Sequence, residues 1–213
     1  MSYLEDKAQE LKKAIKGSIA VYIDAANLEQ STKEMFVIPR DVPQNLKAYL
    51  TGNLRWYVKY DILKKFFENL GPVARIAFYS AGFGTTSHNN FLAFLKKGLG
   101  FNLNTKPLKE YKDHTPEVPH RKANFDVEIS IDAVLQRDDF NTFVLFSGDC
   151  DFKYLIEYLR GQGKMCIVFS MRGHVAEELP PASNYYFDII DFRHDLLEVR
   201  PKLRPKNAKN PAF

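Results

Sequence analysis

Short apolar runs alternate along this chain with longer segments in which apolar residues recur every three or four positions. The short runs, several of which hold β-branched residues, are typical of strands buried on both faces. Such strands are predicted at 18–23, 73–79, 101–108, 143–146, 165–169 and 186–190. Helical spacing predicts helices at 2–16, 54–70, 89–99, 122–137, 152–160 and 175–179. Because strands and helices alternate, the sequence predicts an α/β fold with a central parallel sheet flanked by helices.

The same pattern divides the chain into an N-terminal helix, a core domain and a tail. Residues 1–17 form an amphipathic helix that ends at Gly17, and the α/β domain follows at 18–195. Within this domain, residues 29–53 fit neither the strand period nor the helix period, and they contain two prolines and a glycine. We therefore expect an irregular insertion there, which is a candidate substrate-facing flap. The final segment, 196–213, is rich in Lys, Arg and Pro, and we expect it to be a flexible basic tail.

The most informative stretch is 143–152, FVLFSGDCDF. Its apolar run stops at Ser147 and Gly148, which suit a sharp turn, and Asp149 and Asp151 follow directly. Helical spacing begins behind them, so the two acids are predicted at the carboxyl end of a strand, the edge where α/β sheets bind ligands. Either acid could instead cap the helix and interact with its dipole, and the pair alone favours capping and metal binding about equally.

Further acids occupy comparable positions elsewhere in the chain. Asp24 follows the first predicted strand, and Asn27 lies three residues later across a turn of small residues. Asp126 is in the first turn of a predicted helix, and Asp132 lies about 240° further around it at ~100° per residue. These two side chains cannot share one face. Asp126 is therefore the better candidate for a common site, and Asp132 is either a second-line member or a buried cap or salt-bridge partner.

The acids can converge if the strands that end at Asp24 and Asp149 are neighbours. Asp126 and Asp151 would then join them in one cleft. Four carboxylates without histidine or cysteine are typical of a Mg²⁺ or Mn²⁺ site, because hard cations prefer oxygen ligands. Such a site can activate water and neutralise a phosphodiester transition state, with one acid helping to accept the proton of the water.

Bulk properties add limits to this interpretation. The 213-residue chain is 45% hydrophobic, which allows a substantial core, and its net charge of +4 is compatible with a polyanionic partner.

Cys150 and Cys166 form neither a disulfide framework nor a zinc spacing, and we expect buried free thiols. His114 and His120 fall in a charged loop, where a surface role is favoured over metal ligation. No apolar run has membrane-spanning length and no signal segment is present, so we expect a cytoplasmic protein.

Three sequence blocks occur in a fixed order: VYIDAANL, KANFDVEISIDA and FVLFSGDCDFKYLIEYLRGQGKMCIVF. In this order they resemble NYN domains, the LabA-like branch of the PIN-like nuclease superfamily, over about residues 18–192. The resemblance implies a three-layer, Rossmann-like PIN fold and a metal-dependent RNase activity. The acids that it implies for the metal site are Asp24, Asp126, Asp149 and Asp151. It also implies supporting or substrate-binding roles for four polar residues: Asn27, Lys122, Asp132 and Ser147. Of these, Lys122 would contact phosphate.

Four functions are compatible with these patterns. The first is a Mg²⁺- or Mn²⁺-dependent endoribonuclease whose insertion and basic tail bind RNA in a salt-sensitive way. The second is a catalytically weak or inactive RNA-binding regulator, which would tolerate Asn or Ser at the acid positions. A sugar-nucleotide transferase would explain Asp149 and Asp151 but neither Asp24 nor Asp126. A purely structural domain would make every acid an independent cap. Homo-oligomerisation, the RNA target and the preference between RNA and DNA stay open.

Overall fold

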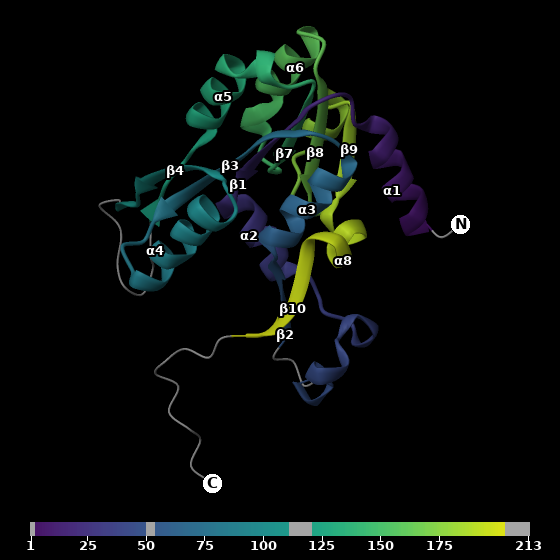
Figure 1. Ribbon diagram of the computed structural model, residues 1–213, viewed down its shortest axis with the longest axis vertical. Helices are drawn as coiled ribbons and strands as arrows, with labels where there is room; N and C mark the ends of the chain where they lie inside the picture. The colour runs from purple at the N-terminus through teal and green to yellow at the C-terminus, as the bar shows by residue number, and fades with distance from the viewer. Residues whose placement is uncertain (1–2, 50–53, 111–120, 203–213) are drawn as a thin grey trace.

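The computed structural model describes residues 3–49, 54–110 and 121–202. Its centre is a six-stranded sheet with the order β4-β3-β1-β7-β8-β9 (Figure 1). The strands are β1 (Ile19–Asp24), β3 (Val73–Gly82), β4 (Asn102–Pro107), β7 (Thr142–Phe146), β8 (Met165–Ser170) and β9 (Tyr185–Asp188). Every neighbouring pair in this sheet is parallel, which confirms the predicted fold class.

Helices cover both faces of the sheet and make three layers (Figure 1). One face packs against α1 (Tyr3–Ala14), α2 (Ala25–Glu34), α3 (Tyr60–Leu70) and α8 (Arg193–Leu196). The other packs against α5 (Asp126–Leu135), α6 (Lys153–Gly161) and α7 (Leu179–Ala182). In β1, Val21 and Ile23 enter the first core while Ala20 and Tyr22 enter the second. The inner strands β1, β7 and β8 are nearly unbroken apolar runs because both of their faces are buried, whereas the edge strand β4 is largely polar.

Strand β1 occupies the position that builds the site. It lies between β3 and β7, and its Ile23 is paired with Phe78 on one side and Phe146 on the other. The chain leaves β1 to form β3 on one side and later forms β7 on the other. The carboxyl ends of β1 and β7 therefore meet at a switch in strand order, where open α/β sheets bind ligands.

Residues 54–70 differ from the single helix that the sequence predicts. Residues 54–58 form strand β2 (Leu54–Val58), and only the following segment is helical. Strand β2 pairs antiparallel with β10 (Leu197–Pro201), so the first part of the predicted flexible tail is also a strand. Trp56 and Val199, paired across this ribbon, are buried. The ribbon thus gains from burial of one face, which local helical spacing could not reveal.

The predicted insertion at 29–53 begins as a continuation of helix α2, which ends only at Glu34. Two short 3₁₀ segments follow, Pro39–Asp41 and Gln44–Tyr49. Asp41 anchors this part of the chain, because its buried carboxylate accepts hydrogen bonds from Arg193 Nε at 2.9 Å and Nη2 at 3.3 Å. The segment after α2 is therefore held against α8.

Smaller differences concern the loops and the short helices. The helix expected at 175–179 is instead α7, since 175–178 lack helical structure. Helix α4 (Thr86–Ala93) continues into a π-helical turn, Phe94–Gly98. Within the predicted charged loop, β5 (Lys109–Glu110) pairs with β6 (Arg121–Lys122). His114, His120 and residues 203–213 of the predicted tail lie outside the described residues. Among the helices of the described segments, none has the length and apolar character needed to cross a membrane.

Candidate active site

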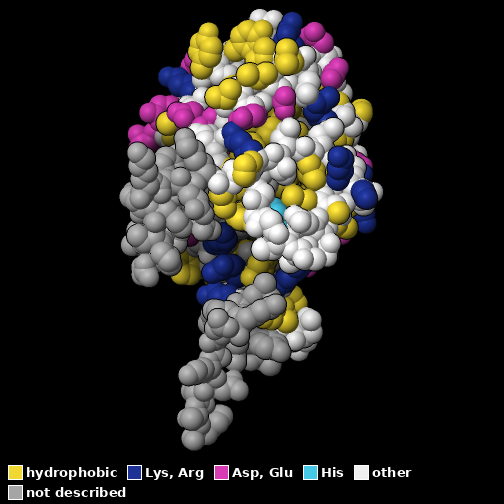
Figure 2. Space-filling view, turned by 90° about the vertical axis from the view of Figure 1, so that its left-hand side faces the viewer, with side chains coloured by type: hydrophobic (Ala, Val, Ile, Leu, Met, Phe, Trp, Pro, Cys, Tyr) yellow, Lys and Arg dark blue, Asp and Glu magenta, His cyan; other side chains and the backbone are white. Residues whose placement is uncertain are grey.

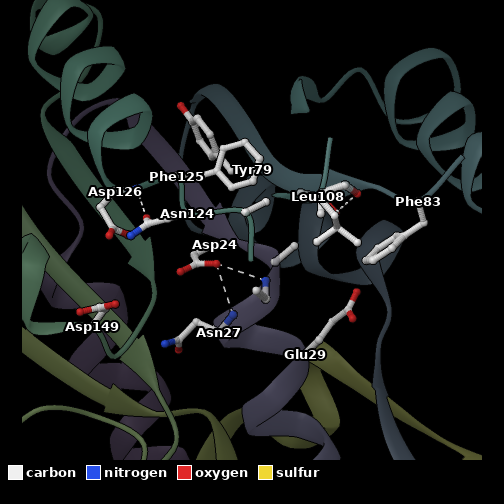
Figure 3. A pocket seen from close by; sticks show the side chains of 15 residues that line it. Asp24, Asn27, Glu29, Tyr79, Phe83, Leu108, Asn124, Phe125, Asp126 and Asp149 are labelled. Carbon is white, nitrogen blue, oxygen red and sulfur yellow. Dashed lines mark hydrogen bonds between the residues drawn. The ribbon is translucent and has the colours of Figure 1, made fainter. Parts of the chain in front are cut away.

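A cavity of about 470 Å³ opens at the carboxyl edge of the sheet, beside the ends of β1 and β3. Asp24, Asp126 and Asp149 line it, and they come from three separate elements (Figure 3). Asp24 ends β1, Asp126 begins α5, and Asp149 follows the turn after β7. The convergence of strand ends that the sequence suggests is therefore present for these three acids.

Asp24 is both a helix cap and a wall of the cavity. Its Oδ1 accepts hydrogen bonds from the backbone amides of Ala26 at 3.1 Å and Asn27 at 3.3 Å. Burial raises the pKa of Asp24, and the charge of Asp126 raises it further, although the Asn27 amide and the Ser147 hydroxyl act in the opposite direction. Capping and site membership are thus not alternatives for this residue.

Ser147 and Asn27 connect the two strand ends. The buried hydroxyl of Ser147 donates to Asp24 Oδ2 at 3.3 Å and accepts from the Asp149 amide at 3.3 Å. The side-chain carbonyl of Asn27 accepts from the Gly148 amide at 2.9 Å. These bonds fix the turn that carries Asp149 relative to the turn that carries Asp24.

Asp126 is positioned by the residues just before α5. Its backbone amide donates to the side-chain oxygen of Asn124 at 2.9 Å, and Asn124 itself lines the cavity. The sequence analysis did not select Asn124. An Asn two residues before a helix is a known local acceptor for backbone amides, so the signal was present.

Asp151 does not line the main cavity with the other three acids. It is exposed, and it lines a neighbouring groove between α5 and α6 together with Ile131 and Tyr154 instead of the main cavity. Its amide donates to Asp149 Oδ1 at 3.1 Å. One possible ligand atom from each of Asp149, Cys150 and Asp151 lies within 4.8 Å of the others. The Cys150 side chain is exposed, contrary to the expectation of a buried thiol, whereas Cys166 is buried as expected.

Asp132 points to a different environment. Its Oδ2 accepts from the Tyr79 hydroxyl at 2.7 Å and from Asn104 Nδ2 at 3.1 Å, which ties α5 to β3 and β4. The rotation between Asp126 and Asp132 around the helix gives the physical reason, and the structure favours the structural interpretation of Asp132. The backbone of Lys122 lies in β6, but its side chain is outside what the structure describes.

Glu29 is a further acidic lining residue that the sequence analysis missed, because it fell in the predicted irregular insertion. It projects from α2 and pairs with Lys33, with 3.7 Å between the carboxylate oxygen and Nζ. Figure 3 shows Glu29 on the opposite side of the cavity from Asp126 and Asp149.

The polar groups around this cavity fit a hard divalent cation. Carboxylates, amide oxygens and hydroxyls line it, and neither His nor Cys occurs among its described lining residues. Oxygen-only donors of this kind suit Mg²⁺ or Mn²⁺ and not Zn²⁺ held by His and Cys. Burial is the main cause of the raised pKa of Asp24, and the nearby charge of Asp126 adds to it. A cation bound between the two carboxylates would offset that repulsion.

A family model described as the NYN domain matches residues 18–191, which span the whole sheet and all the acids above. The chain belongs to the NYN domain family. This confirms the resemblance inferred from the three sequence blocks, and it places the chain in the PIN-like nuclease superfamily.

Two comparisons with individual proteins add to this result. The chain is 30% identical over 161 residues to the low amplitude and bright protein LabA of Synechococcus elongatus, with 71% of this chain and 87% of LabA covered. A crystal structure of a protein of unknown function from Vibrio parahaemolyticus matches with a TM-score of 0.63 and 21% identity, covering 85% of this chain and 96% of that one. The second likeness supports the fold alone.

Proposed function

We propose that this NYN domain is a Mg²⁺- or Mn²⁺-dependent endoribonuclease that hydrolyses RNA phosphodiester bonds. The observation that carries the proposal is the meeting of Asp24, Asp126 and Asp149 in one cavity from three separate elements. Independent helix caps would not need to face a common space. Membership in the PIN-like nuclease superfamily supports the reaction class.

In this proposal Asp24, Asp126 and Asp149 hold the metal, and Asn27 and Ser147 keep them in position. A bound Mg²⁺ or Mn²⁺ would supply an acidified water and charge neutralisation at the phosphate. Asp24 is the carboxylate best suited to take the proton of the attacking water, since burial raises its pKa. The water oxygen bonds to phosphorus as the bond from phosphorus to the ribose oxygen breaks. The ribose oxygen takes up a proton from solvent, and the proton held by Asp24 is later released to solvent.

A second candidate function is RNA binding with weak or absent catalysis. It is favoured by the exposure of Asp151, which lines a neighbouring groove and not the cavity, so one of the four acids predicted for the metal site is absent from the cavity lining. A sugar-nucleotide transferase is a weaker candidate, because a D-x-D site accounts for Asp149 and Asp151 but for neither Asp24 nor Asp126, which line the cavity. Cytoplasmic localisation and homo-oligomerisation stay predictions.

Cleavage of a labelled single-stranded RNA separates the two candidates. Wild type should cut with Mn²⁺ or Mg²⁺ and not with EDTA, and Asp149→Asn should abolish cutting while RNA binding persists. Asp138→Asn is the matched control, since that side chain is 82% exposed and lies outside the cavity lining. RNA binding by wild type without metal-dependent cutting on several RNAs would favour the second candidate.

A further inference from the structure

Three hollows follow one another along helix α2. The helix begins at the acidic cavity, which Asn27 and Glu29 line. Glu29 and Lys33 also line a second hollow of about 260 Å³ between α2 and β2. Lys33 then lines a third hollow, of about 370 Å³, beyond the end of the helix. Adjoining hollows share lining residues, so the three lie next to one another in a row that leads away from the acids, and this row is called the groove below.

The far part of this groove is basic. Lys33, Arg55 and Arg200 line the second hollow, and Arg55 and Lys202 line the third. In Figure 2, Lys and Arg side chains gather just above the narrow lower part of the molecule, at the level of β2 and β10. The groove therefore changes from acidic at the cavity to basic along the β2–β10 ribbon.

The two arginines face each other across the ribbon. Arg55 and Arg200 are direct partners in the antiparallel register, a placement that costs stability for like charges. Arg200 forms an ion pair with Glu198. Arg55 has no ion pair among the described residues, and its Nε is buried without a hydrogen-bond partner. An anion between the two guanidinium groups would offset their repulsion and satisfy Arg55.

Aromatic residues accompany these charges. Tyr57 lies on the same face of β2 as Arg55, and its ring centre is 5.9 Å from the guanidinium carbon of Arg200. Tyr60 also lines the second hollow. It is only 7% exposed, and its hydroxyl finds no hydrogen-bond partner within the described structure. The groove thus offers aromatic rings and an unsatisfied donor in addition to cations.

We propose that this groove along α2 and the β2–β10 ribbon binds single-stranded RNA and guides it to the acidic cavity. The inference deepens the proposed function and rests on it for the identity of the polyanion. Cations that follow a backbone, with aromatic rings for bases, are the usual means of binding single strands. Helix α2, which runs beside the groove, has 10 residues and is about 15 Å long at 1.5 Å per residue.

Salt dependence of RNA binding in EDTA tests the groove separately from catalysis. The probe is a labelled oligouridylate of about 12 nucleotides, within the site sizes of single-strand grooves. The variant with Arg55→Gln and Arg200→Gln should bind more weakly, and its plot of log affinity against log salt should flatten by roughly 1.4, two phosphate contacts at ~0.7 each. The variant with Arg55→Lys and Arg200→Lys keeps the charge and should keep the slope.

The matched control carries Lys12→Gln and Lys13→Gln on α1, two exposed cations whose removal changes the net charge equally. It should retain the wild-type slope. If the double Gln variant fails to fold, Arg200→Gln alone is used, because that side chain is 57% exposed. The slope of log affinity against log salt should then change by about half as much. Tyr57→Ala should weaken binding by about fivefold or more, whereas Tyr57→Phe should not.

The outcomes separate the groove from the nuclease. If the slope of log affinity against log salt changes only in the groove variants, RNA binding in the groove is supported even if wild type never cuts RNA. Equal slopes for wild type, the groove variant and the α1 control would overturn the groove even if metal-dependent cutting is observed. An equal loss of slope in groove and control variants would also overturn it, because binding would then follow net charge alone.

Discussion

The backbone amide of Gly148 donates a 2.9 Å hydrogen bond to the side-chain carbonyl of Asn27, across 121 residues of sequence. Gly148 also accepts a 2.9 Å bond from the Ala176 amide through its own carbonyl. The turn that carries Asp149 is therefore held on two sides, by α2 and by the loop after β8. The separation between Asp24 and Asp149 depends on this arrangement more than on either acid alone.

Replacing Asn27 tests that dependence. Asn27→Ala removes the acceptor of the Gly148 amide, so the turn loses one support and the acids lose their spacing. We expect kcat/KM for RNA cleavage to fall about 10- to 100-fold, the range for residues that orient metal ligands. Asn27→Asp keeps an acceptor and is expected to lose less activity. Unchanged kcat/KM in Asn27→Ala would show that the turn needs no support from α2.

Gly148 leaves no room for a side chain. A Cβ at this position would overlap the backbone carbonyl of His174 and lie 2.7 Å from Ser170 Oγ. We expect Gly148→Ala to lower the free energy of unfolding by about 1–3 kcal/mol and to reduce cleavage. Gly161→Ala is the control, because no atom lies within 4 Å of its added Cβ. Urea denaturation measures both, and equal stabilities would refute the steric argument.

Sequence patterns located the central strands well for a physical reason. Strands such as β7 and β8 are buried on both faces, so their sequences are unbroken apolar runs that do not depend on their partners. Strand β2 is different. Trp56 continues the helical spacing of Tyr60 and Leu63, which lie in α3, but it also suits a half-buried strand. The partner that decides between the two, β10, lies near the other end of the chain.

In the candidate site, too, some residues could be placed from local sequence and others depend on the folded structure. Asp24 and Asp149 could be placed from the sequence, because parallel strands end at a common edge. Asp151 could not, since the short helical turn Cys150–Phe152 directs it to the neighbouring groove. Glu29 was missed because α2 buries Ser31 and Thr32 beyond Leu28, and these polar residues do not show the apolar period of a helix.

The charge of Asp24 should destabilise the metal-free protein. Its folded-state pKa is raised by burial, so the carboxyl contributes stability only below the ordinary pKa of about 3.9 and loses it as the pH rises through the raised value. In EDTA at neutral pH, Asp24→Asn should therefore raise the Tm, and with Mn²⁺ it should abolish cleavage. Asn also keeps the helix cap.

Two comparisons check the origin of this effect. The gain in Tm for Asp24→Asn should shrink as the pH falls toward 4, where the wild-type carboxyl becomes neutral. Asp24→Ala should lose about 1 kcal/mol relative to Asp24→Asn, since it removes the cap to the Ala26 and Asn27 amides. A Tm that falls in Asp24→Asn at neutral pH would contradict the assignment of unfavourable burial.

The ion pair between Asp41 and Arg193 should be important for stability. Asp41→Asn leaves the buried guanidinium of Arg193 without its compensating charge, and we expect a loss of about 3–5 kcal/mol in urea unfolding. Asp139→Asn breaks the Arg75 pair at 3.3 Å, in which the acid is 58% exposed, and should cost at most about 1 kcal/mol. Similar losses of unfolding free energy in both variants would mean that burial does not determine how much an ion pair stabilises this protein.

Asp149 and Asp151 should contribute unequally to cleavage, although they are one residue apart. Asp149 lines the acidic cavity, whereas Asp151 is exposed toward the groove between α5 and α6. We expect Asp149→Asn to lower kcat by roughly 10²–10³, as for removal of one preorganised charged group, and Asp151→Asn to lower it by about tenfold or less. Single-turnover cleavage with saturating Mn²⁺ measures the chemical step in both variants, and their Tm values control for folding. Equal losses would place Asp151 beside Asp149 among the metal ligands, which is within reach of both side chains because one carboxylate oxygen of each lies within 4.8 Å of the other.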